Sequence, residues 1–159
     1  MTTINVPEDG SCLFRCILLF LNKEHRNYSR FKNGQVKNKQ MNIDEHRKCM
    51  EIRQEIVNYL ESNKETYDTI FYDDHEHYNN IDERINMMRK STEYGGIIEI
   101  DCAVKLYDIP IEIFVDRNTR SFNKIAEFKH YNSGKYKKKK KQVCKLLLNN
   151  DHYNLISST

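Results

Sequence analysis

Five helices are predicted in the first two-thirds of the chain, three of which (45–62, 81–90 and 97–107) carry apolar residues at the spacing of one helix face. The first of the five is apolar on nearly all sides, as expected of a helix inside a core. Ser11 and Asp44 can accept hydrogen bonds from the free N–H groups at the start of the first two helices. The predicted helices are 12–22, 45–62, 66–72, 81–90 and 97–107.

The last third of the chain has a different pattern, in which short β-branched or aromatic segments are separated by turn residues. Residues 4–7 add a short extended lead-in, because Pro7 biases Val6 away from helix. Helices followed by strands indicate an α+β fold with the sheet packed against the helices, and the length predicts a single domain over 1–159. The predicted strands are 109–115, 121–128, 143–149 and 152–156.

The composition is typical of a globular chain with a heavily charged surface: 38% of the residues are hydrophobic and 31% are charged. The net charge is only +3, and much of the basic excess lies in one run, Lys137–Lys141. A uniformly basic face for a polyanion is therefore not implied. Residues 23–43 are polar and are expected to form a surface excursion. No stretch approaches the roughly 20 apolar residues that a membrane span needs.

Five cysteines are present, without a CxxC pair and without a secretory signal at the start of the chain. We therefore expect free thiols in a reducing compartment, the cytosol, or the host cytosol if the chain is a viral or bacterial effector. Four of the five lie among apolar neighbours and are predicted to be small core residues. These four are Cys16, Cys49, Cys102 and Cys144.

Cys12 differs from the other cysteines because it lies where a predicted helix begins. A thiol becomes a good nucleophile only as a thiolate, and the N-terminus of a helix lowers the pKa of a thiol placed there. The preceding turn, Asp9-Gly10-Ser11, also leaves backbone N–H groups that can point toward an oxyanion on an attacked carbonyl. This local context alone is equally compatible with a buried structural cysteine.

A thiolate catalyst needs a base and a leaving-group acid, and histidine usually serves as both. Of the six histidines, His152 enters an apolar strand directly after another apolar strand, whereas His25 and His46 lie in polar segments and are expected to be solvated. Asn154 faces the same side of that strand as His152, so it could orient the imidazole. By itself, His152 could equally fill a polar gap in a sheet.

Three blocks of the sequence resemble those of the OTU (ovarian tumour) cysteine proteases. Residues 7–15, Pro-Glu-Asp-Gly-Ser-Cys-Leu-Phe-Arg, are similar to the nucleophile motif of that family. Residues 88–100 resemble its second block, and residues 152–154, His-Tyr-Asn, resemble its terminal histidine block. The blocks occur in the order of the family and at roughly its separations, and together they cover most of 6–156.

The resemblance implies an OTU-like fold with a mixed β-sheet packed between helices. It also implies a deubiquitinase, which hydrolyses the isopeptide bond after the C-terminal Gly-Gly of ubiquitin or a ubiquitin-like modifier through an acyl-enzyme. By position, Cys12 matches the nucleophile and His152 the general base and acid. Asn154 matches the residue that orients the histidine, where other members have aspartate. Asp9 matches the acid of the motif and is expected to organise the cysteine loop and the oxyanion site.

The resemblance also suggests which residues contact the substrate. Gly10 and Ser11 lie beside the nucleophile, and the loop Tyr94-Gly95-Gly96 is expected to border the channel that admits Gly-Gly, since glycine lets two backbones approach closely. Tyr94 keeps an aromatic wall where the family often has tryptophan. The reaction needs no cofactor. The expected partner is ubiquitin, polyubiquitin or a ubiquitin-like modifier, and the protein is expected to act as a monomer.

Two other segments suggest different functions. Asp73-Asp74-His75-Glu76-His77 could hold a metal, but zinc sites usually take ligands from other segments too, so a solvated loop is expected. Lys137–Lys141 could bind nucleic-acid phosphates or act as a nuclear signal, but a solvated hairpin between two strands is the expected interpretation. The rival functions are a non-catalytic ubiquitin-binding module that kept the fold and a nucleic-acid binder.

Overall fold

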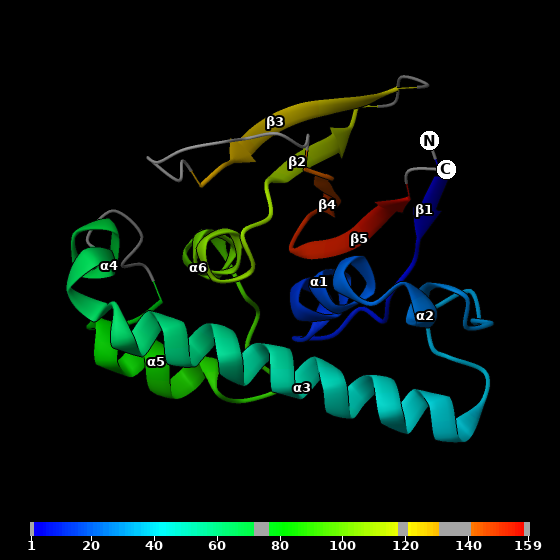
Figure 1. Ribbon diagram of the computed structural model, residues 1–159, viewed down its shortest axis with the longest axis horizontal. Coiled ribbons are helices and arrows are strands. Elements are labelled where there is room, and N and C mark those ends of the chain that lie inside the picture. Colours follow the sequence, from blue (N-terminus) through cyan, green and yellow to red (C-terminus); the bar gives the residue numbers. More distant parts are fainter. Residues whose placement is uncertain (1, 72–76, 118–120, 131–140, 158–159) are drawn as a thin grey trace.

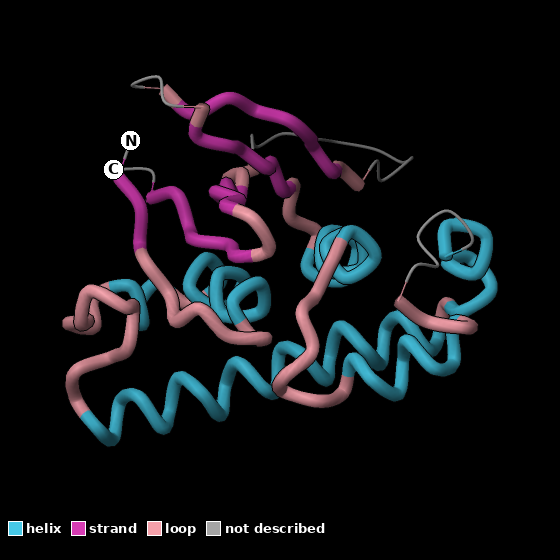
Figure 2. The backbone as a smooth tube through the Cα atoms, turned by 180° about the vertical axis from the view of Figure 1, so that it is seen from behind, coloured by secondary structure: helices cyan, strands magenta, loops and turns pink. Residues whose placement is uncertain are grey.

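A computed structural model gives the structure of the protein for residues 2–71, 77–117, 121–130 and 141–157. Figures 1 and 2 show two layers, with the helices along one face of a sheet. The helices are α1 (Cys12–Leu21), α2 (Lys23–Arg26), α3 (Lys39–Ser62), α4 (Lys64–Phe71), α5 (Ile81–Met88) and α6 (Ile97–Tyr107). The strands are β1 (Thr2–Ile4), β2 (Ile111–Asp116), β3 (Phe122–Phe128), β4 (Cys144–Asn149) and β5 (His152–Ser157).

The five-stranded sheet has the order β1-β5-β4-β2-β3. β2 and β4 are parallel and the other neighbours are antiparallel, so the predicted α+β fold with a mixed sheet is confirmed. In both views the helices lie along one face of the sheet (Figures 1 and 2). β1 pairs with β5, with Thr3 opposite Ile156, so the two ends of the chain lie side by side (Figure 1). This pairing brings the residues that lead into α1 next to β5.

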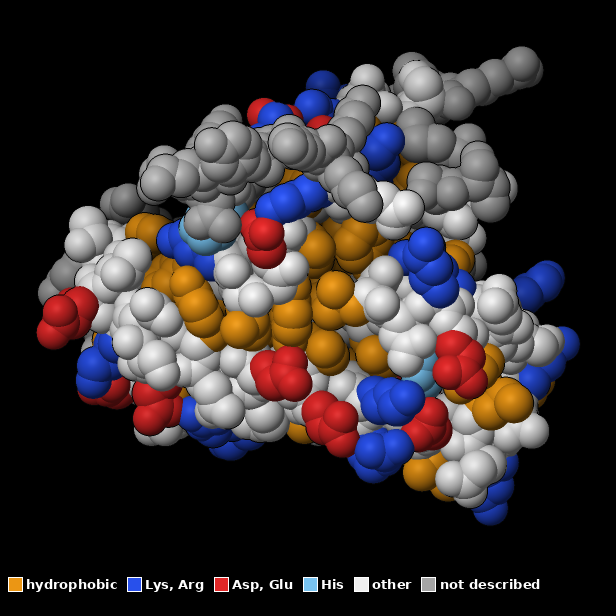
Figure 3. Space-filling model, in the orientation of Figure 1, with side chains coloured by type: hydrophobic (Ala, Val, Ile, Leu, Met, Phe, Trp, Pro, Cys, Tyr) orange, Lys and Arg blue, Asp and Glu red, His pale blue; other side chains and the backbone are white. Residues whose placement is uncertain are grey.

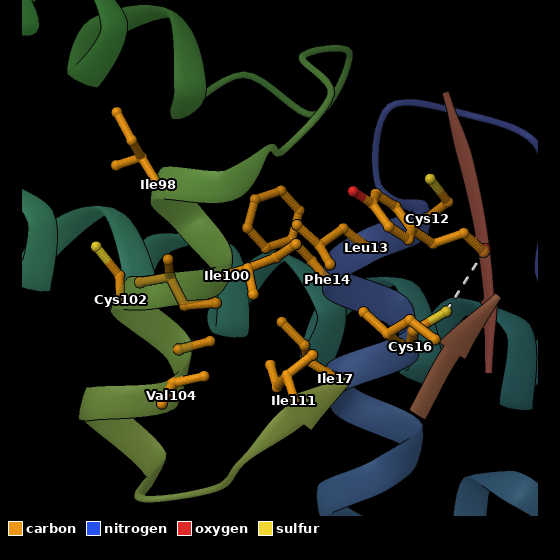
Figure 4. Close-up of a cluster of buried hydrophobic side chains, with 14 of the residues drawn as sticks. Cys12, Leu13, Phe14, Cys16, Ile17, Ile98, Ile100, Cys102, Val104 and Ile111 are labelled. Atoms are coloured by element: carbon orange, nitrogen blue, oxygen red, sulfur yellow. Dashed lines mark hydrogen bonds between the residues drawn. The ribbon is translucent and has the colours of Figure 1, made fainter. Parts of the chain in front are cut away.

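The core is centred on α1. All of its residues from Cys12 to Leu19 are buried, as the apolar pattern predicts. In Figure 4, Phe14 points toward Ile100 of α6, and Ile17 lies beside Ile111 of β2. The four cysteines predicted to be core residues are fully buried and free: Cys16, Cys49, Cys102 and Cys144.

The start of α3 differs from the prediction. The helix begins at Lys39, and the side chain of Asn38 accepts a hydrogen bond from the Met41 N–H at 3.0 Å. Asp44, the predicted cap, lies inside the helix and pairs with Arg47 at 2.6 Å. The first turn of α3 is exposed, so it has no apolar period from which a helix could be predicted. The other predicted helices and strands agree with the structure to within two residues at each end.

A cluster of buried charges lies beside α1, where the polar sequence predicted surface. Glu45 of α3 is fully buried and accepts hydrogen bonds from Arg15 at 3.0 Å and from Arg30 at 2.5 Å. His25, predicted to be solvated, is also fully buried, with Nδ1 3.7 Å from Glu45, and burial lowers the pKa of His25. The prediction was wrong because polar neighbours in sequence do not reveal that a side chain turns inward. Arg15 also lies 3.6 Å from Asp9, so the cluster reaches the turn before α1.

The molecular surface carries charges of both signs. Figure 3 shows one face, where a band of hydrophobic side chains lies beneath the sheet and Lys, Arg, Asp and Glu side chains are interspersed below that band. Of the run Lys137–Lys141, only Lys141 lies within the described residues, and it forms an ion pair with Asp108. In the described ranges, no helix is both long and apolar enough to cross a membrane.

The buried cluster predicts a large effect of Glu45→Ala on stability. The substitution leaves the Arg15 and Arg30 guanidinium groups without their buried carboxylate, so the free energy of unfolding in urea should fall by about 3–5 kcal/mol. The matched control on the same helix is Glu51→Ala, which removes an exposed pair with Arg47 and should cost less than about 1 kcal/mol. Equal decreases in the free energy of unfolding for the two variants would contradict the assignment of Glu45 as the buried partner of Arg15 and Arg30.

Candidate active site

Cys12 is the first residue of α1 and follows a tight turn formed by residues 7–11. The Asp9 N–H donates to Pro7 O at 3.0 Å, and the Cys12 N–H donates to Asp9 O at 3.3 Å. The carboxylate of Asp9 accepts a hydrogen bond from the Ser11 N–H at 2.9 Å. Asp9 therefore shapes the turn through both its main chain and its side chain.

Gly10 allows this turn to press against a second loop. A Cβ atom at Gly10 would lie 2.3 Å from Thr92 O, closer than any side chain can tolerate. The buried Ser11 hydroxyl donates to Ser91 O at 3.2 Å, and the Ser11 N–H is occupied by Asp9. The Gly10 N–H donates to no described residue. Next to the thiol, the Gly10 N–H is without a described partner and the Cys12 N–H has only a long hydrogen bond of 3.3 Å, so these two groups can face an oxyanion.

His152 and Asn154 lie on one face of β5, as the strand period predicts. The Asn154 Oδ1 atom is 3.0 Å from His152 Nε2 and also accepts a hydrogen bond from the Val6 N–H at 3.0 Å. A main-chain N–H can only donate, so the side-chain atom that faces Val6 must be the amide oxygen. That oxygen in turn requires a proton on Nε2. The tautomer of His152 is therefore fixed, with the lone pair on Nδ1.

His152 Nδ1 is buried and has no hydrogen-bond partner among the described residues. The neighbouring residue, Tyr153, contacts the start of α1 through its backbone. Its main chain hydrogen-bonds the Cys12 thiol and accepts a hydrogen bond from Cys16 Sγ at 3.5 Å. Figure 4 shows Cys12 at the end of α1 beside this strand. The thiol thus lies against the strand that carries the free imidazole nitrogen.

The Cys12 side chain is only 1% exposed, and this burial raises the pKa of the thiol. Backbone hydrogen bonds from Tyr153 and Leu13 lower the pKa but do not offset the burial, and the negative charge of Asp9 raises it further. The prediction that the helix N-terminus lowers the pKa of Cys12 is therefore wrong, because burial has the larger effect. Cys12 is a neutral thiol that needs a base to become a nucleophile.

The predicted loop Tyr94-Gly95-Gly96 packs onto the same end of α1. A Cβ atom at Gly95 would lie 2.7 Å from the Leu13 side chain, so the loop can approach α1 only because this residue is glycine. The Gly96 N–H donates to Glu99 Oε1 at 2.8 Å, which caps α6. Tyr94 is 46% exposed. Gly95 therefore allows two segments of the protein itself to pack closely, whereas the Tyr94 side chain is exposed.

A pocket of about 570 Å³ adjoins this site. It is formed by α5 with the residues just before it, by the loop that precedes α6, and by the β4–β5 turn. It reaches Tyr153, but neither Cys12 nor His152 lines it. Three carboxylates and one arginine are among its lining residues. The charged and polar lining residues include Glu83, Glu93, Asp151, Arg84 and His77.

A metal centre receives no support from the described residues, among which no group of three or more His, Cys, Asp or Glu side chains could hold an ion. Of the charged run Asp73–His77, only His77 lies within the described residues, and it lines the pocket.

Sequence reasoning missed several residues that build the site. The Val6 N–H fixes the Asn154 amide, and Arg53 of α3 donates to Gly10 O at 2.8 Å. No sequence pattern indicated that Glu83 and Glu93 line the pocket. These contacts join segments far apart in the chain, so no local pattern of residues could indicate them.

Papain-like cysteine peptidases combine a catalytic thiol with an imidazole that an amide side chain orients, and in this structure the thiol lies against the strand that carries such an imidazole. The sequence model of one such family, the OTU-like cysteine proteases, matches residues 7–153. The chain belongs to this family, so the predicted resemblance is confirmed. No curated protein matches the chain by sequence.

Solved structures share the fold. The OTU domain protease of Dera Ghazi Khan virus has a TM-score of 0.64 and 16% identity, over 97% of this chain and 78% of that one. The OTU protein of Hazara virus, solved bound to ubiquitin, has a TM-score of 0.60 and 15% identity, over 99% and 82% of the two chains. The OTU domain of OTUD1 has a TM-score of 0.61 and 11% identity, over 96% and 82%.

The raised pKa predicts how Cys12 reacts with a small electrophile. Because the thiol is neutral at pH 7, the rate of its alkylation by iodoacetamide should rise about tenfold per pH unit between pH 7 and 9. Peptide mass spectrometry after timed quenching measures this rate separately for each cysteine. A rate already at its plateau below pH 7 would instead show a preformed thiolate–imidazolium pair.

Proposed function

We propose that the protein is a deubiquitinase, a cysteine peptidase that hydrolyses the (iso)peptide bond after the C-terminal Gly-Gly of ubiquitin or a ubiquitin-like modifier. One observation carries this proposal: Asn154 fixes the His152 tautomer, which leaves a buried, unpartnered Nδ1 on the strand that contacts the Cys12 thiol.

The first half of the reaction forms an acyl-enzyme. His152 Nδ1 takes the Cys12 proton as sulfur attacks the carbonyl carbon of the substrate glycine. The oxyanion is stabilised by backbone N–H groups of the turn, for which Gly10 and Cys12 are the available donors. When the tetrahedral intermediate collapses, the Nδ1 proton passes to the leaving lysine amine, and a thioester remains on Cys12.

The second half releases the product. His152 Nδ1 removes a proton from water, which attacks the thioester and forms a second tetrahedral intermediate. Its collapse breaks the carbon–sulfur bond, returns the proton to sulfur and frees the carboxyl terminus. Asn154 holds the imidazole in one orientation through both halves, and Asp9 keeps the turn in shape. The chemistry requires no cofactor.

The pocket beside Tyr153 is the proposed site for the residues that precede the scissile bond. Its loop Tyr94-Gly95-Gly96 reaches α1 close to Cys12, so an extended chain lying in the pocket could pass its carboxyl end toward the thiol. Glu83 and Glu93 favour a segment with basic side chains. The complex of the Hazara virus OTU protein with ubiquitin supports a ubiquitin-like partner.

The remaining expectations are part of the same proposal. The protein acts as a monomer and as a single catalytic domain, in the cytosol or in the host cytosol. The rival ubiquitin-binding module would share the pocket but would not require His152 or Cys12. The nucleic-acid alternative rests on Lys137–Lys141, where Lys141 alone is described and is paired with Asp108.

Steady-state hydrolysis of ubiquitin joined at its C-terminus to a fluorogenic amine tests the proposal. Cys12→Ala and His152→Ala should abolish turnover, and Asn154→Ala should lower kcat by about 10- to 100-fold because the imidazole loses its fixed orientation. The control is Cys144→Ala, which removes another fully buried thiol and should leave kcat within about twofold. If wild type binds ubiquitin without turnover, the protein is the non-catalytic module.

The charge of the pocket predicts a binding effect. Glu93→Gln keeps an acceptor for the Tyr78 hydroxyl, which donates to Glu93 at 2.8 Å, but removes the negative charge. KM for the same substrate should rise by about two- to fivefold with kcat unchanged, and the difference should shrink at high salt. Asp68→Asn makes the same charge change on the exposed face of α4 and should leave KM unchanged. Equal KM values for Glu93→Gln and wild type would remove Glu93 from the binding site.

A further inference from the structure

Arg53 is a fully buried cation beside the turn that precedes Cys12. It projects from the middle of α3, and its guanidinium donates to Gly10 O at 2.8 Å and to Met88 O at 3.0 Å. The same group lies over the ring of Phe14, 4.2 Å from its centroid. Within the described residues, Arg53 forms no ion pair with a carboxylate.

The absence of such a pair distinguishes Arg53 from the other buried arginines of the described chain. Those are each paired with a buried glutamate, Arg15 with Glu45 and Arg84 with Glu99. A buried cation without a counter-charge is costly, and desolvation lowers the pKa of Arg53 accordingly. The Arg53 guanidinium instead binds main-chain carbonyl oxygens, so it constrains the backbone around it.

The backbone that Arg53 holds is the peptide unit between Gly10 and Ser11. Its carbonyl oxygen accepts from the guanidinium at 2.8 Å, and its N–H donates to the Asp9 carboxylate at 2.9 Å. A peptide unit is planar, so fixing both polar ends fixes its orientation. The peptide units on either side carry the Gly10 and Cys12 N–H groups and are joined to this one through the φ and ψ angles of Gly10 and Ser11. The Cys12 N–H is also held by Asp9 O at 3.3 Å.

A second loop is held against the same turn. Arg53 also donates to Ser91 O at 3.2 Å, and the backbone of Thr92 lies where a Gly10 Cβ atom would be. The Ser11 hydroxyl joins the same group of contacts, at 3.2 Å from Arg53 Nη2. The turn is thus fixed between α3 and the loop that leads to the pocket.

We propose that Arg53 is a positioning residue of the thiol site. By fixing the Gly10–Ser11 peptide, its guanidinium holds the backbone N–H groups of the turn in the arrangement that stabilises the oxyanion before substrate binds. This inference rests on the proposed peptidase function. Arg53 touches neither the substrate nor the reacting atoms, so it acts on the transition state only through the turn.

Arg53→Lys tests the proposal because lysine keeps the positive charge but cannot donate to several carbonyls in the planar geometry of a guanidinium. With ubiquitin joined to a fluorogenic amine as substrate, kcat of Arg53→Lys should fall by about 10- to 100-fold and KM should change by less than about threefold. The fall in kcat should be smaller than the fall that follows complete removal of an oxyanion donor. Alkylation of Cys12 by iodoacetamide forms no oxyanion, so its rate should stay within about twofold of wild type.

Arg26→Lys is the matched control. Arg26 also donates to two main-chain carbonyls, of Leu19 and Phe20, and lies over the ring of Phe20, but at the other end of α1. It should leave kcat unchanged. A parallel fall of kcat and alkylation rate in Arg53→Lys would indicate a general structural role and overturn the proposal, as would an unchanged kcat.

A measurement without substrate separates this inference from the proposed function. Hydrogen exchange of the Ser11 amide, followed by NMR, should be at least about tenfold faster in Arg53→Lys than in wild type, because the peptide is then held at one end only. Unchanged Ser11 exchange refutes the positioning role even if the protein is inactive. If the wild type is inactive but Ser11 exchange is faster in Arg53→Lys as predicted, the peptidase function alone is refuted.

Discussion

The site depends on one side-chain oxygen that joins the two ends of the chain. Asn154 Oδ1, on the last strand, accepts hydrogen bonds from both the Val6 N–H and His152 Nε2. The first contact requires β1 to pair with β5, and it orients the amide. The second fixes the histidine tautomer. The fold therefore determines which imidazole nitrogen is available, and a change in the β1–β5 register would release the Val6 contact that orients the amide.

Much of this arrangement could be predicted from the sequence, because its signals are local. The apolar period of α1 located Cys12 at a helix start, and the two-residue period of β5 placed Asn154 on the face of His152. The order of helices before strands gave the α+β class. The start of α3 could not be predicted in the same way, since its first turn is exposed and has no apolar period.

Several features that escaped prediction involve burial of polar groups. His25 lies in a polar segment but is buried beside Glu45, and burial reverses the pKa shift expected for Cys12 at a helix N-terminus. Arg53 has no motif around it. Whether a charged side chain turns inward depends on partners from other helices and strands. Those partners are known only once the packing of the helices is known.

The central claim is that Cys12 attacks the carbonyl at the end of a ubiquitin-like chain. Ubiquitin bearing an electrophile in place of its C-terminal carboxylate tests it most directly, with intact-mass spectrometry as the readout. The account predicts a single covalent adduct that maps to Cys12 and is lost in Cys12→Ala. The same electrophile on a ubiquitin-like modifier should be run in parallel. Wild-type protein that binds these probes but forms no adduct with any of them would contradict the account.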